Sequence, residues 1–399
     1  MEKRITLQQD QEYNFKMYFK LRVYIVKTII IYVTLLVQTK TSYAQDKIIE
    51  ISDSNFLDYL INDARIDMNQ DGFIQKSEAL LLENLSLRKA ELVHLPLNEF
   101  ENIKNIHIIY CEINGKLKIN NLSKLYQISI TYSSLDFLTI GNSPSLKYLG
   151  VLESSVPEIT NLELENAEYL SVKKSDVKYL TFKRAPKLKR LDCSSNELKE
   201  LDISNLTDLQ ILNCSFCNLN FISFSNNRSL DYVGLSNNYL SFINTDSLYN
   251  ITHLDIENNF FECIDLYPMK KIKTFNCGYN RLSELNFYEN ITLKDIFAKK
   301  NNLSSIYSHP NSNVERLDIS NNLMNKIDLN FASKMRYLKV NNCPFLETII
   351  FHKSSKLTHI EFWETPKLKS IRASKSCGKV INKRIRLEKH KGVKFIPLN

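Results

Sequence analysis

A pattern of the type Leu-x-x-Leu-x-Leu recurs through most of this 399-residue chain. Its first positions follow one another every 21 residues, with two intervals of 22 after Ile103 and Met335. These first positions are Leu82, Ile103, Leu125, Leu146, Ala167, Leu188, Leu209, Leu230, Ile251, Ile272, Leu293, Val314, Met335 and Leu357. Such a period builds a solenoid, because a single coil cannot bury its apolar side chains alone. Since solenoids mostly bind other molecules, the period argues against an enzyme.

The coil that begins at Leu188 shows the internal pattern. Counted from zero, its apolar residues occupy positions 0, 3, 5, 10, 13 and 15. Positions 3 and 5, and again 13 and 15, have the side-chain spacing of a β-strand. Each coil is therefore expected to carry two short extended segments that stack into parallel ladders. The predicted fold is a mainly β solenoid of about 14 coils with little helix.

Position 8 is polar in most coils. It holds Asn196, Asn238, Asn259, Asn280, Asn301 and Asn322, with Cys217 and Cys343 as substitutes and Ala90, Cys111, Ser133, Ser154 and Ser175 in the first five coils. A buried Asn must pair its amide, here with backbone groups of its own and neighbouring coils. The weaker pattern, together with Asn161, predicts less regular packing before Leu188 than from Leu188 to Val340.

With Asn or Cys at position 8, the pattern resembles the leucine-rich-repeat signature L-x-x-L-x-L-x-x-N/C-x-L from Leu82 to about Ala373. It is most similar to the bacterial 21-residue subtype, whose second half is matched by Leu201-Asp202-Ile203-Ser204. The resemblance implies a leucine-rich-repeat solenoid that binds a protein partner.

The N-terminus is predicted to be an export signal. Basic residues Lys16, Lys20, Arg22 and Lys27 precede an apolar run over 28–37, and Ser42-Tyr43-Ala44 fits a cleavage site before Gln45. Met17 offers a second start. An uncleaved anchor is the alternative, but a spanning helix needs about 20 apolar residues. The predicted organisation is a signal peptide (1–44), an N-terminal cap (45–81), the solenoid (82–373) and a basic C-terminal cap (374–399). The protein is then secreted or on the cell surface, with no membrane span after cleavage.

The net charge of +8 is concentrated at the ends. Residues 1–44 carry a surplus of 4 and residues 374–399 a surplus of 7, which leaves −3 for the solenoid. Nucleic-acid binding would need basic residues along the solenoid itself, so it is not expected. In the C-terminal segment, apolar residues are predicted to cover the last coil: Val380, Ile381, Ile385, Leu387, Val393 and Phe395.

The period also accounts for most of the eight cysteines. Cys193, Cys214 and Cys277 occupy position 5, and Cys111, Cys217 and Cys343 occupy position 8. The Cys214-Ser215-Phe216-Cys217 sequence is therefore interpreted as repeat rather than as a redox motif. Cys193 and Cys214 stack one coil apart, but parallel Cβ directions make a disulfide between them unfavourable.

One segment before the repeats is not explained by the period. Residues 67–78 read Asp-Met-Asn-Gln-Asp-Gly-Phe-Ile-Gln-Lys-Ser-Glu, and they fit D-x-[DN]-x-[DN]-G-x5-E at every constrained position. The segment resembles an EF-hand or dockerin-like calcium loop. The ligands this predicts are Asp67, Asn69, Asp71, the carbonyl of Phe73 and Glu78, with Gln75 holding a water.

A helix beginning at Ser54 or Asn55 should enter this loop, with Phe56, Leu57, Leu60 and Ile61 on one face. EF-hands usually pair, and here there is one loop, so it is interpreted as a structural cap of the solenoid. The alternative is a loop that kept its shape and lost its ion.

The candidate ligand surface follows from positions that point away from the core. It carries aromatic residues at positions 2, 4 and 6, namely Tyr148, Tyr169, Tyr232, Phe297, Tyr337 and Trp363. Aromatic side chains among polar ones are typical of protein-binding hot spots. They are also suited to stacking on sugar rings, so a glycan is the alternative ligand. The third interpretation is that Tyr occurs at these exposed positions only because it favours β-strands.

Overall fold

The structure, a computed structural model, describes residues 26–31, 46–388 and 392–398. It divides into two compact units, Met1–Leu82 and Glu83–Asn399. Most of the predicted signal peptide lies outside the described residues, and residues 26–31 are helical. In the described ranges, no helix combines the length and apolar character needed to cross a bilayer.

Between residues 46 and 82, the first unit contains three short helical elements, α2 (Ser54–Asp58), the π-helical η1 (Tyr59–Asp63) and α3 (Lys76–Ala79). The first helix begins at Ser54, as predicted, because Asp53 caps it by accepting a hydrogen bond from the Phe56 N–H over 2.9 Å. Phe56 and Leu60 are fully buried, so the predicted apolar face exists. These elements flank the acidic loop 67–78.

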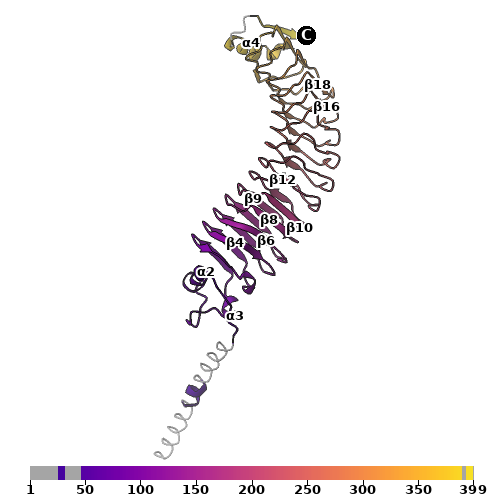
Figure 1. Cartoon of the computed structure of the whole chain (residues 1–399). Coiled ribbons are helices and arrows are strands. Elements are labelled where there is room, and N and C mark those ends of the chain that lie inside the picture. The colour runs from indigo at the N-terminus through magenta and orange to yellow at the C-terminus, as the bar shows by residue number, and fades with distance from the viewer. Residues whose placement is uncertain (1–25, 32–45, 389–391, 399) are drawn as a thin grey trace, which may run out of the picture. The chain divides into compact units, whose positions relative to one another are not determined.

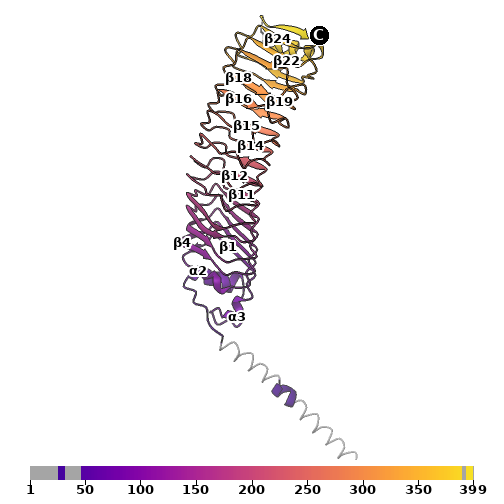
Figure 2. The same cartoon turned by 90° about the vertical axis from the view of Figure 1, so that its right-hand side faces the viewer.

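The second unit is a parallel β-solenoid, and its first ladder is a continuous 14-stranded sheet (Figures 1 and 2). Its strands are β1 (Asn84–Arg88), β3 (Asn105–Ile109), β5 (Gln127–Thr131), β7 (Tyr148–Leu152), β9 (Tyr169–Lys173), β11 (Arg190–Asp192), β12 (Ile211–Asn213), β13 (Tyr232–Gly234), β14 (His253–Asp255), β15 (Thr274–Asn276), β17 (Asp295–Phe297), β19 (Arg316–Asp318), β21 (Tyr337–Lys339) and β23 (His359–Glu361). The pairing is in register with the repeat, as Leu191 opposite Leu212 illustrates. The predicted parallel β-solenoid with little helix is confirmed.

The position-8 amides pair as predicted. Asn196 donates from Nδ2 to the carbonyl oxygens of Val172 and Cys193, at 2.7 Å each, and its Oδ1 accepts from the Ser175 N–H at 3.0 Å. One side chain thus joins a coil to the coil before it. Each later Asn at position 8 likewise donates to its own coil and to the preceding one.

The residues at position 7, one place before these Asn residues, share an unusual backbone conformation and form a column along the stack of coils. Its members all adopt left-handed backbone angles, with φ between 47° and 59°. They are Lys89, Tyr110, Tyr132, Glu153, Lys174, Ser195, Phe216, Asn237, Asn258, Tyr279, Lys300, Asn321, Asn342 and Glu364. No glycine, the residue that tolerates this conformation best, occupies the column.

The second ladder is interrupted, unlike the first. A five-stranded sheet contains β2 (Glu91–Leu92), β4 (Glu112–Ile119), β6 (Ser134–Ile140), β8 (Glu158–Glu163) and β10 (Tyr179–Arg184). After a gap come the pair β16 (Glu284–Phe287) and β18 (Ser305–Ser308), and then the sheet of β20 (Lys326–Leu329), β22 (Thr348–Phe351), β24 (Ser370–Ser374) and β25 (Lys394–Leu398). Figure 1 shows the solenoid curving with β16 and β18 on its outer side.

Position 14 contributes to the gap. In the coils before it, Thr139, Thr160 and Thr181 occupy this position, and β-branched residues favour strands. In the gap, Asp202, Asn244 and Asp265 each accept a hydrogen bond from the backbone N–H two residues later, at 2.8–2.9 Å. This local turn competes with the ladder. Asn286 and Asp328 make the same turn within β16 and β20, so the effect is a bias.

The expectation of less regular packing before Leu188 is only partly met. Register shifts do occur in the β4–β6 and β8–β10 pairs, and Asn161 has a left-handed φ of 54°. However, the first-ladder strands are longer there, five residues in β1 to β9 against three in β11 to β23. Small Ser at position 8 supports this, since the Ser133 hydroxyl accepts from the Cys111 N–H and donates to the Thr131 carbonyl.

After the last coil come the 3-10 helix η3 (Lys375–Cys377), the helix α4 (Gly378–Leu387) and β25. Another 3-10 helix, η2 (Leu97–Glu99), lies in the first coil. Strand β25 extends the second ladder beside β24, and α4 packs near both. Of the predicted apolar cover, Ile381 is fully buried, whereas Leu387 is 62% exposed. A Cβ on Gly378 would lie 2.9 Å from the Phe395 ring, so this contact needs glycine.

Candidate functional site

The acidic loop is curled by its own side chains. Oδ2 of Asp67 accepts from the Gly72 N–H at 3.1 Å, and Oδ1 of Asn69 accepts from the Asp71 N–H at 2.9 Å. Oδ1 of Asp71 accepts from the Phe73 N–H at 2.9 Å, and Gly72 has a φ of 81°. The predicted oxygen ligands therefore share one tight loop.

Two carboxylates in the loop differ in their hydrogen bonding. Oδ1 of Asp67 is buried without a hydrogen-bond partner, which leaves an oxygen suited to a cation. Glu78 instead uses its carboxylate to accept from the N–H groups of Met68 (2.8 Å) and Gln75 (3.0 Å). Among the described residues, no group of three or more His, Cys, Asp or Glu side chains is arranged to hold a metal. Carboxylate and carbonyl oxygens are the donors that calcium prefers, but Oδ2 of Asp71 accepts from the Asn69 and Gln75 carboxamides, at 2.9 Å each, and Glu78 is held by backbone amides. Both carboxylates would have to leave these donors to hold an ion.

The loop is braced by the segment that precedes the first unit's helices. The Ile49 N–H donates to the Ile74 carbonyl at 2.8 Å, and the Lys76 N–H donates to the Lys47 carbonyl at 3.0 Å. Ile74 is buried, as predicted. This antiparallel bridge supports the single loop from within its own unit.

The first-ladder face, defined as the outward positions 2, 4 and 6 of the 14-stranded sheet, carries Tyr148 and Tyr169. Tyr126, at position 1 just before β5, joins them in a tyrosine cluster. The rings of Tyr148 and Tyr169 stack with centroids 5.2 Å apart and planes 14° apart. Tyr126 meets Tyr148 edge-on at 5.4 Å, and their hydrogen bond raises the pKa of Tyr148. All three rings are between 39% and 46% exposed. Such a cluster offers apolar area with polar tips.

The six predicted ligand residues do not form one patch. Tyr337 stacks on His359 at 4.6 Å, and Trp363 lies one coil further, 44% exposed. Tyr337 is nine coils from Tyr148, roughly 43 Å at the spacing of adjacent strands. Tyr232 and Phe297 lie between the two groups and are half-buried.

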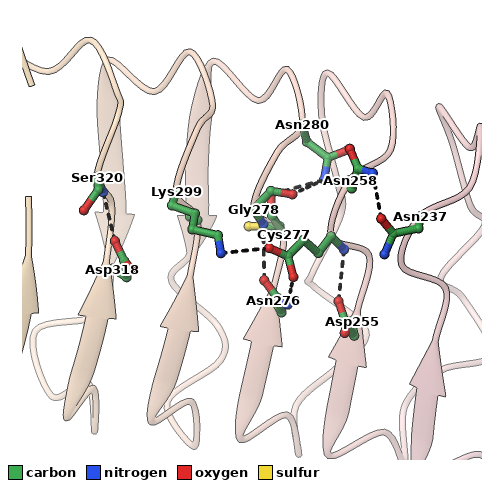
Figure 3. A network of polar contacts seen from close by, with 12 residues as sticks. Asn237, Asp255, Asn258, Asn276, Cys277, Gly278, Asn280, Lys299, Asp318 and Ser320 are labelled. Atoms are coloured by element: carbon green, nitrogen blue, oxygen red, sulfur yellow. Dashed lines mark hydrogen bonds and ion pairs between the residues drawn. The ribbon is translucent and has the colours of Figure 1, made fainter. Parts of the chain in front are cut away.

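A polar network occupies the middle of the first-ladder face (Figure 3). Glu257 forms an ion pair with Lys299 at 3.0 Å and accepts from the Asn276 carboxamide at 3.0 Å. Burial raises the pKa of Asp255. Burial opposes the charge of Lys299, but the Glu257 ion pair, together with the nearby Tyr279 and Asp318, raises the Lys299 pKa overall. Figure 3 shows Asp255 and Asn276, which are the last residues of β14 and β15, with Lys299 nearby.

A further group of exposed aromatic residues lies outside the strands, where the sequence prediction did not place them. They occupy positions 7, 9 and 12 of the coils that begin at Leu209, Leu230 and Ile251. They are Phe216, Phe221, Tyr239, Phe242 and Phe260, which are 40–61% exposed. Tyr239 stacks on Phe260 at 6.1 Å, and the Arg281 guanidinium lies 4.8 Å from the Phe260 centroid. Counting aromatic residues at all outward positions of the period would have found them.

Comparison with known proteins gives structural matches alone. No protein-family model matches the sequence, and no curated protein matches it. The functional domain of InlJ from Listeria monocytogenes, described as including a cysteine ladder, is 18% identical with a TM-score of 0.50, over 81% of this chain and 74% of that one. An internalin (inlF) from Listeria monocytogenes is 15% identical with a TM-score of 0.50, over 80% and 94%.

The fold is that of leucine-rich-repeat solenoids. At these identities the likeness concerns the fold alone. In this leucine-rich-repeat solenoid all eight cysteines are free thiols, including Cys193 and Cys214, whose sulfurs lie 3.0 Å apart. Cys263 is exposed and the other seven are buried.

Proposed function

We propose that the chain is an exported, non-enzymatic binding protein that takes a protein partner on its first-ladder face. The observation that carries this proposal is the Tyr126–Tyr148–Tyr169 cluster on the outward face of a long, continuous sheet. Large rings with a polar tip are enriched at the centres of protein interfaces. The negative charge of the solenoid section disfavours nucleic acid as the partner.

The experiment compares two tyrosine pairs. In Tyr148→Ala plus Tyr169→Ala, cross-linking of the exported protein to a cell-surface partner should fall about tenfold, as expected for hot-spot truncation. Tyr110 and Tyr132 provide the control, because they also stack, at 4.9 Å, but stand on the position-7 turns. Equal loss in both double variants, with unchanged melting temperatures, would contradict a site on the first-ladder face.

A glycan ligand is the second candidate, favoured by the surroundings of Trp363. The Trp363 indole is exposed, and the backbone N–H of Trp363 donates to Oδ1 of Asn341 at 3.2 Å, while Nδ2 of Asn341 donates to Glu361 at 2.9 Å. An aromatic face beside carboxamide and carboxylate groups suits the apolar and hydroxyl sides of a sugar ring. Glycan-array binding that is lost in Trp363→Ala, or in the Tyr148–Tyr169 double variant, would support this candidate over a protein partner.

For the acidic loop we propose one structural Ca²⁺ ion, held by Asp67, Asn69, Asp71, the Phe73 carbonyl and Glu78. The unpartnered Asp67 oxygen supports it. With three carboxylates and an exported location, the expected affinity is weak, on the order of 0.1–1 mM. Calcium titration by calorimetry should give heat that Asp71→Ala abolishes and that Asp63→Ala, an exposed carboxylate outside the loop, retains. Absence of both heat and a melting shift would exclude the ion.

Export rests on the sequence of residues 1–44. N-terminal sequencing of the protein from the culture medium or cell surface should begin at Gln45. A mature chain that begins at Met1 or Met17 would contradict cleavage at this position.

A further inference from the structure

A pocket opens beside β4, on the second-ladder side of the first two coils. It has a volume of about 520 Å³ and lies between residues 93–98 of the first coil and residues 116–121 of the second. Strand β2 pairs with β4 only at Glu112 and Ile113, and the first coil then continues into the 3-10 helix η2. The pocket lies beside the part of β4 that follows this pairing, so it is separate from the first-ladder face.

Every titratable side chain that lines this pocket is a base. These side chains are His94, Lys116 and Lys118, and all three are exposed. Lys116 and Lys118 lie on the same face of β4, because side chains alternate along a strand and the intervening Leu117 is buried in the core. The pocket therefore brings together basic groups from two coils.

These bases have no carboxylate partners. Within the described residues, none of the three forms an ion pair, and the Lys116 ammonium lies 5.5 Å from the centroid of the Phe137 ring. Exposed lysines elsewhere in the solenoid often pair with a carboxylate one coil away, as Lys104 does with Glu83 at 2.8 Å. The positive charge of the pocket is therefore not neutralised by the side chains around it.

Carboxamides supply most of the other polar groups in the pocket. Asn98, Asn120 and Asn121 line it. Oδ1 of Asn121 accepts from the Asn142 carboxamide at 3.0 Å, which leaves the Nδ2 hydrogens of Asn121 as donors. The Asn98 carboxamide donates to Glu99 at 3.5 Å, but Glu99 does not line the pocket. The lining therefore offers hydrogen-bond donors beside its basic groups.

We propose that this pocket binds a saccharide through a phosphate or sulfate monoester that the sugar carries. The oxyanion lies against Lys118 and His94, and the carboxamides form hydrogen bonds with the sugar hydroxyl groups. Val93, which is 64% exposed, packs on the apolar C–H side of the sugar ring. Lysine binds phosphate oxygens as a point charge and does not need the planar geometry of an arginine pair. The volume is within the usual range for small-molecule sites, roughly 300–1,000 Å³.

A single ester fits this pocket better than a polyanion does. A protein that binds a nucleic acid contacts about 6–10 phosphates, whereas this pocket offers three bases in one place. The exposed Glu91 and Glu112, which pair at the starts of β2 and β4, would repel a phosphate chain that extended along the coils. The ligand is therefore expected to carry one compact anionic group.

The variants that test the pocket leave the first-ladder face intact. Lys118→Gln removes one charge and Lys118→Glu reverses it at an exposed position of β4. Lys334→Gln is the matched control, because Lys334 is also exposed and lies outside the pocket. Tyr148→Ala plus Tyr169→Ala should bind the ester normally, whatever its effect on a protein partner, so this proposal and the proposed function can fail independently.

The experiment begins with a glycan array that carries phosphorylated, sulfated and uncharged forms of the same saccharides. The full chain should bind an anionic form and not its uncharged counterpart, and the ratio of the two esters assigns phosphate or sulfate. Calorimetry should then show that the ester binds about tenfold more tightly than inorganic phosphate or sulfate, because the sugar hydroxyls add hydrogen bonds.

The same titration compares the variants. Lys118→Gln should weaken ester binding about fivefold, Lys118→Glu should abolish it, and Lys334→Gln should leave it within about twofold. Added sodium chloride should weaken binding, because salt screens the attraction between the ester and the exposed bases.

Four results would overturn the proposal. They are no preference for any anionic saccharide, ester binding that Lys118→Glu retains, an inorganic anion that binds as tightly as the ester, and attachment to phosphatidylglycerol vesicles without binding of soluble esters. The third would mean that the pocket holds a free anion without recognising a sugar. The fourth would mean that it contacts a lipid headgroup. Thermal melts verify that each variant is folded, and Lys118→Gln takes the place of Lys118→Glu if the charge reversal prevents folding.

Discussion

The carboxamide of Asn259 donates to the carbonyl oxygen of Leu235, in the preceding coil, over 2.9 Å. The same side chain donates to the Ile256 carbonyl and accepts from the Leu240 N–H at 3.0 Å. Asn259→Ala leaves these buried backbone groups without hydrogen-bond partners, so the free energy of unfolding should fall by about 3 kcal/mol. Urea denaturation measures it. Asn302→Ala, an exposed asparagine at position 9, should change it by less than about 0.5 kcal/mol. Equal effects would contradict the coil-joining role.

The left-handed column at position 7 predicts a stabilising substitution. Lys89 has a φ of 51°, which strains a side chain that carries a Cβ. Lys89→Gly should raise the free energy of unfolding by about 0.5 kcal/mol, after the greater flexibility of unfolded Gly is counted. The neighbouring Arg88→Gly, in strand β1, should lower it instead. Thermal unfolding that shows both variants destabilised alike would refute the assignment of strain.

The thiols predict selective alkylation. Seven of the cysteines are buried and burial raises the pKa of Cys214, which suppresses its reactive thiolate. Iodoacetamide should therefore add one group to the folded chain, at the exposed Cys263, and none to Cys263→Ser. Mass spectrometry after unfolding in reagent should count eight additions. Rapid modification of Cys193 in the folded chain would show that the core opens at this coil.

Replacing the carboxylate of Asp255 is predicted to raise stability in a pH-dependent way. Burial raises its pKa in the folded protein, so the ionised form costs stability above that pKa, and the cost disappears as the pH falls below the ordinary value. Asp255→Asn should raise the melting temperature at neutral pH, and the gain should vanish at about pH 3. Asp246→Asn, at an exposed carboxylate, should show no such dependence. A gain that persists at low pH would point to packing instead.

The repeat predicted the solenoid because its positions are local. A Leu at positions 3 and 5 must face the core wherever the coil lies, and Asn196 must pair its amide within the turn. The interruption of the second ladder depends on the distance between coils, which no single coil encodes. Its sequence signal, Thr181 against Asp202 at position 14, becomes meaningful only when adjacent coils are compared.

The candidate sites also include features that the local sequence predicts and features that it does not. The acidic loop is contiguous, so its sequence predicted the curled conformation of Asp67, Asn69 and Asp71. The attachment of Glu78 to backbone amides could not be read from a motif that describes ligands alone. The binding surface depends on which outward positions are exposed. Phe216 at position 7 and Phe221 at position 12, both outside the strands, are more exposed than the half-buried Tyr232 at position 2, in β13.

The interrupted second ladder has a mechanical consequence. Between β10 and β16, neighbouring coils are joined by strand pairing along one edge of the stack, whereas the coils before β10 are joined along both. Coils that are paired along one edge can separate at the other edge when a lateral force is applied. The coils that are paired along both edges then move as rigid bodies, and the deformation is concentrated in the middle coils. A force applied at the ends of the solenoid is therefore expected to change its curvature there before any coil unravels.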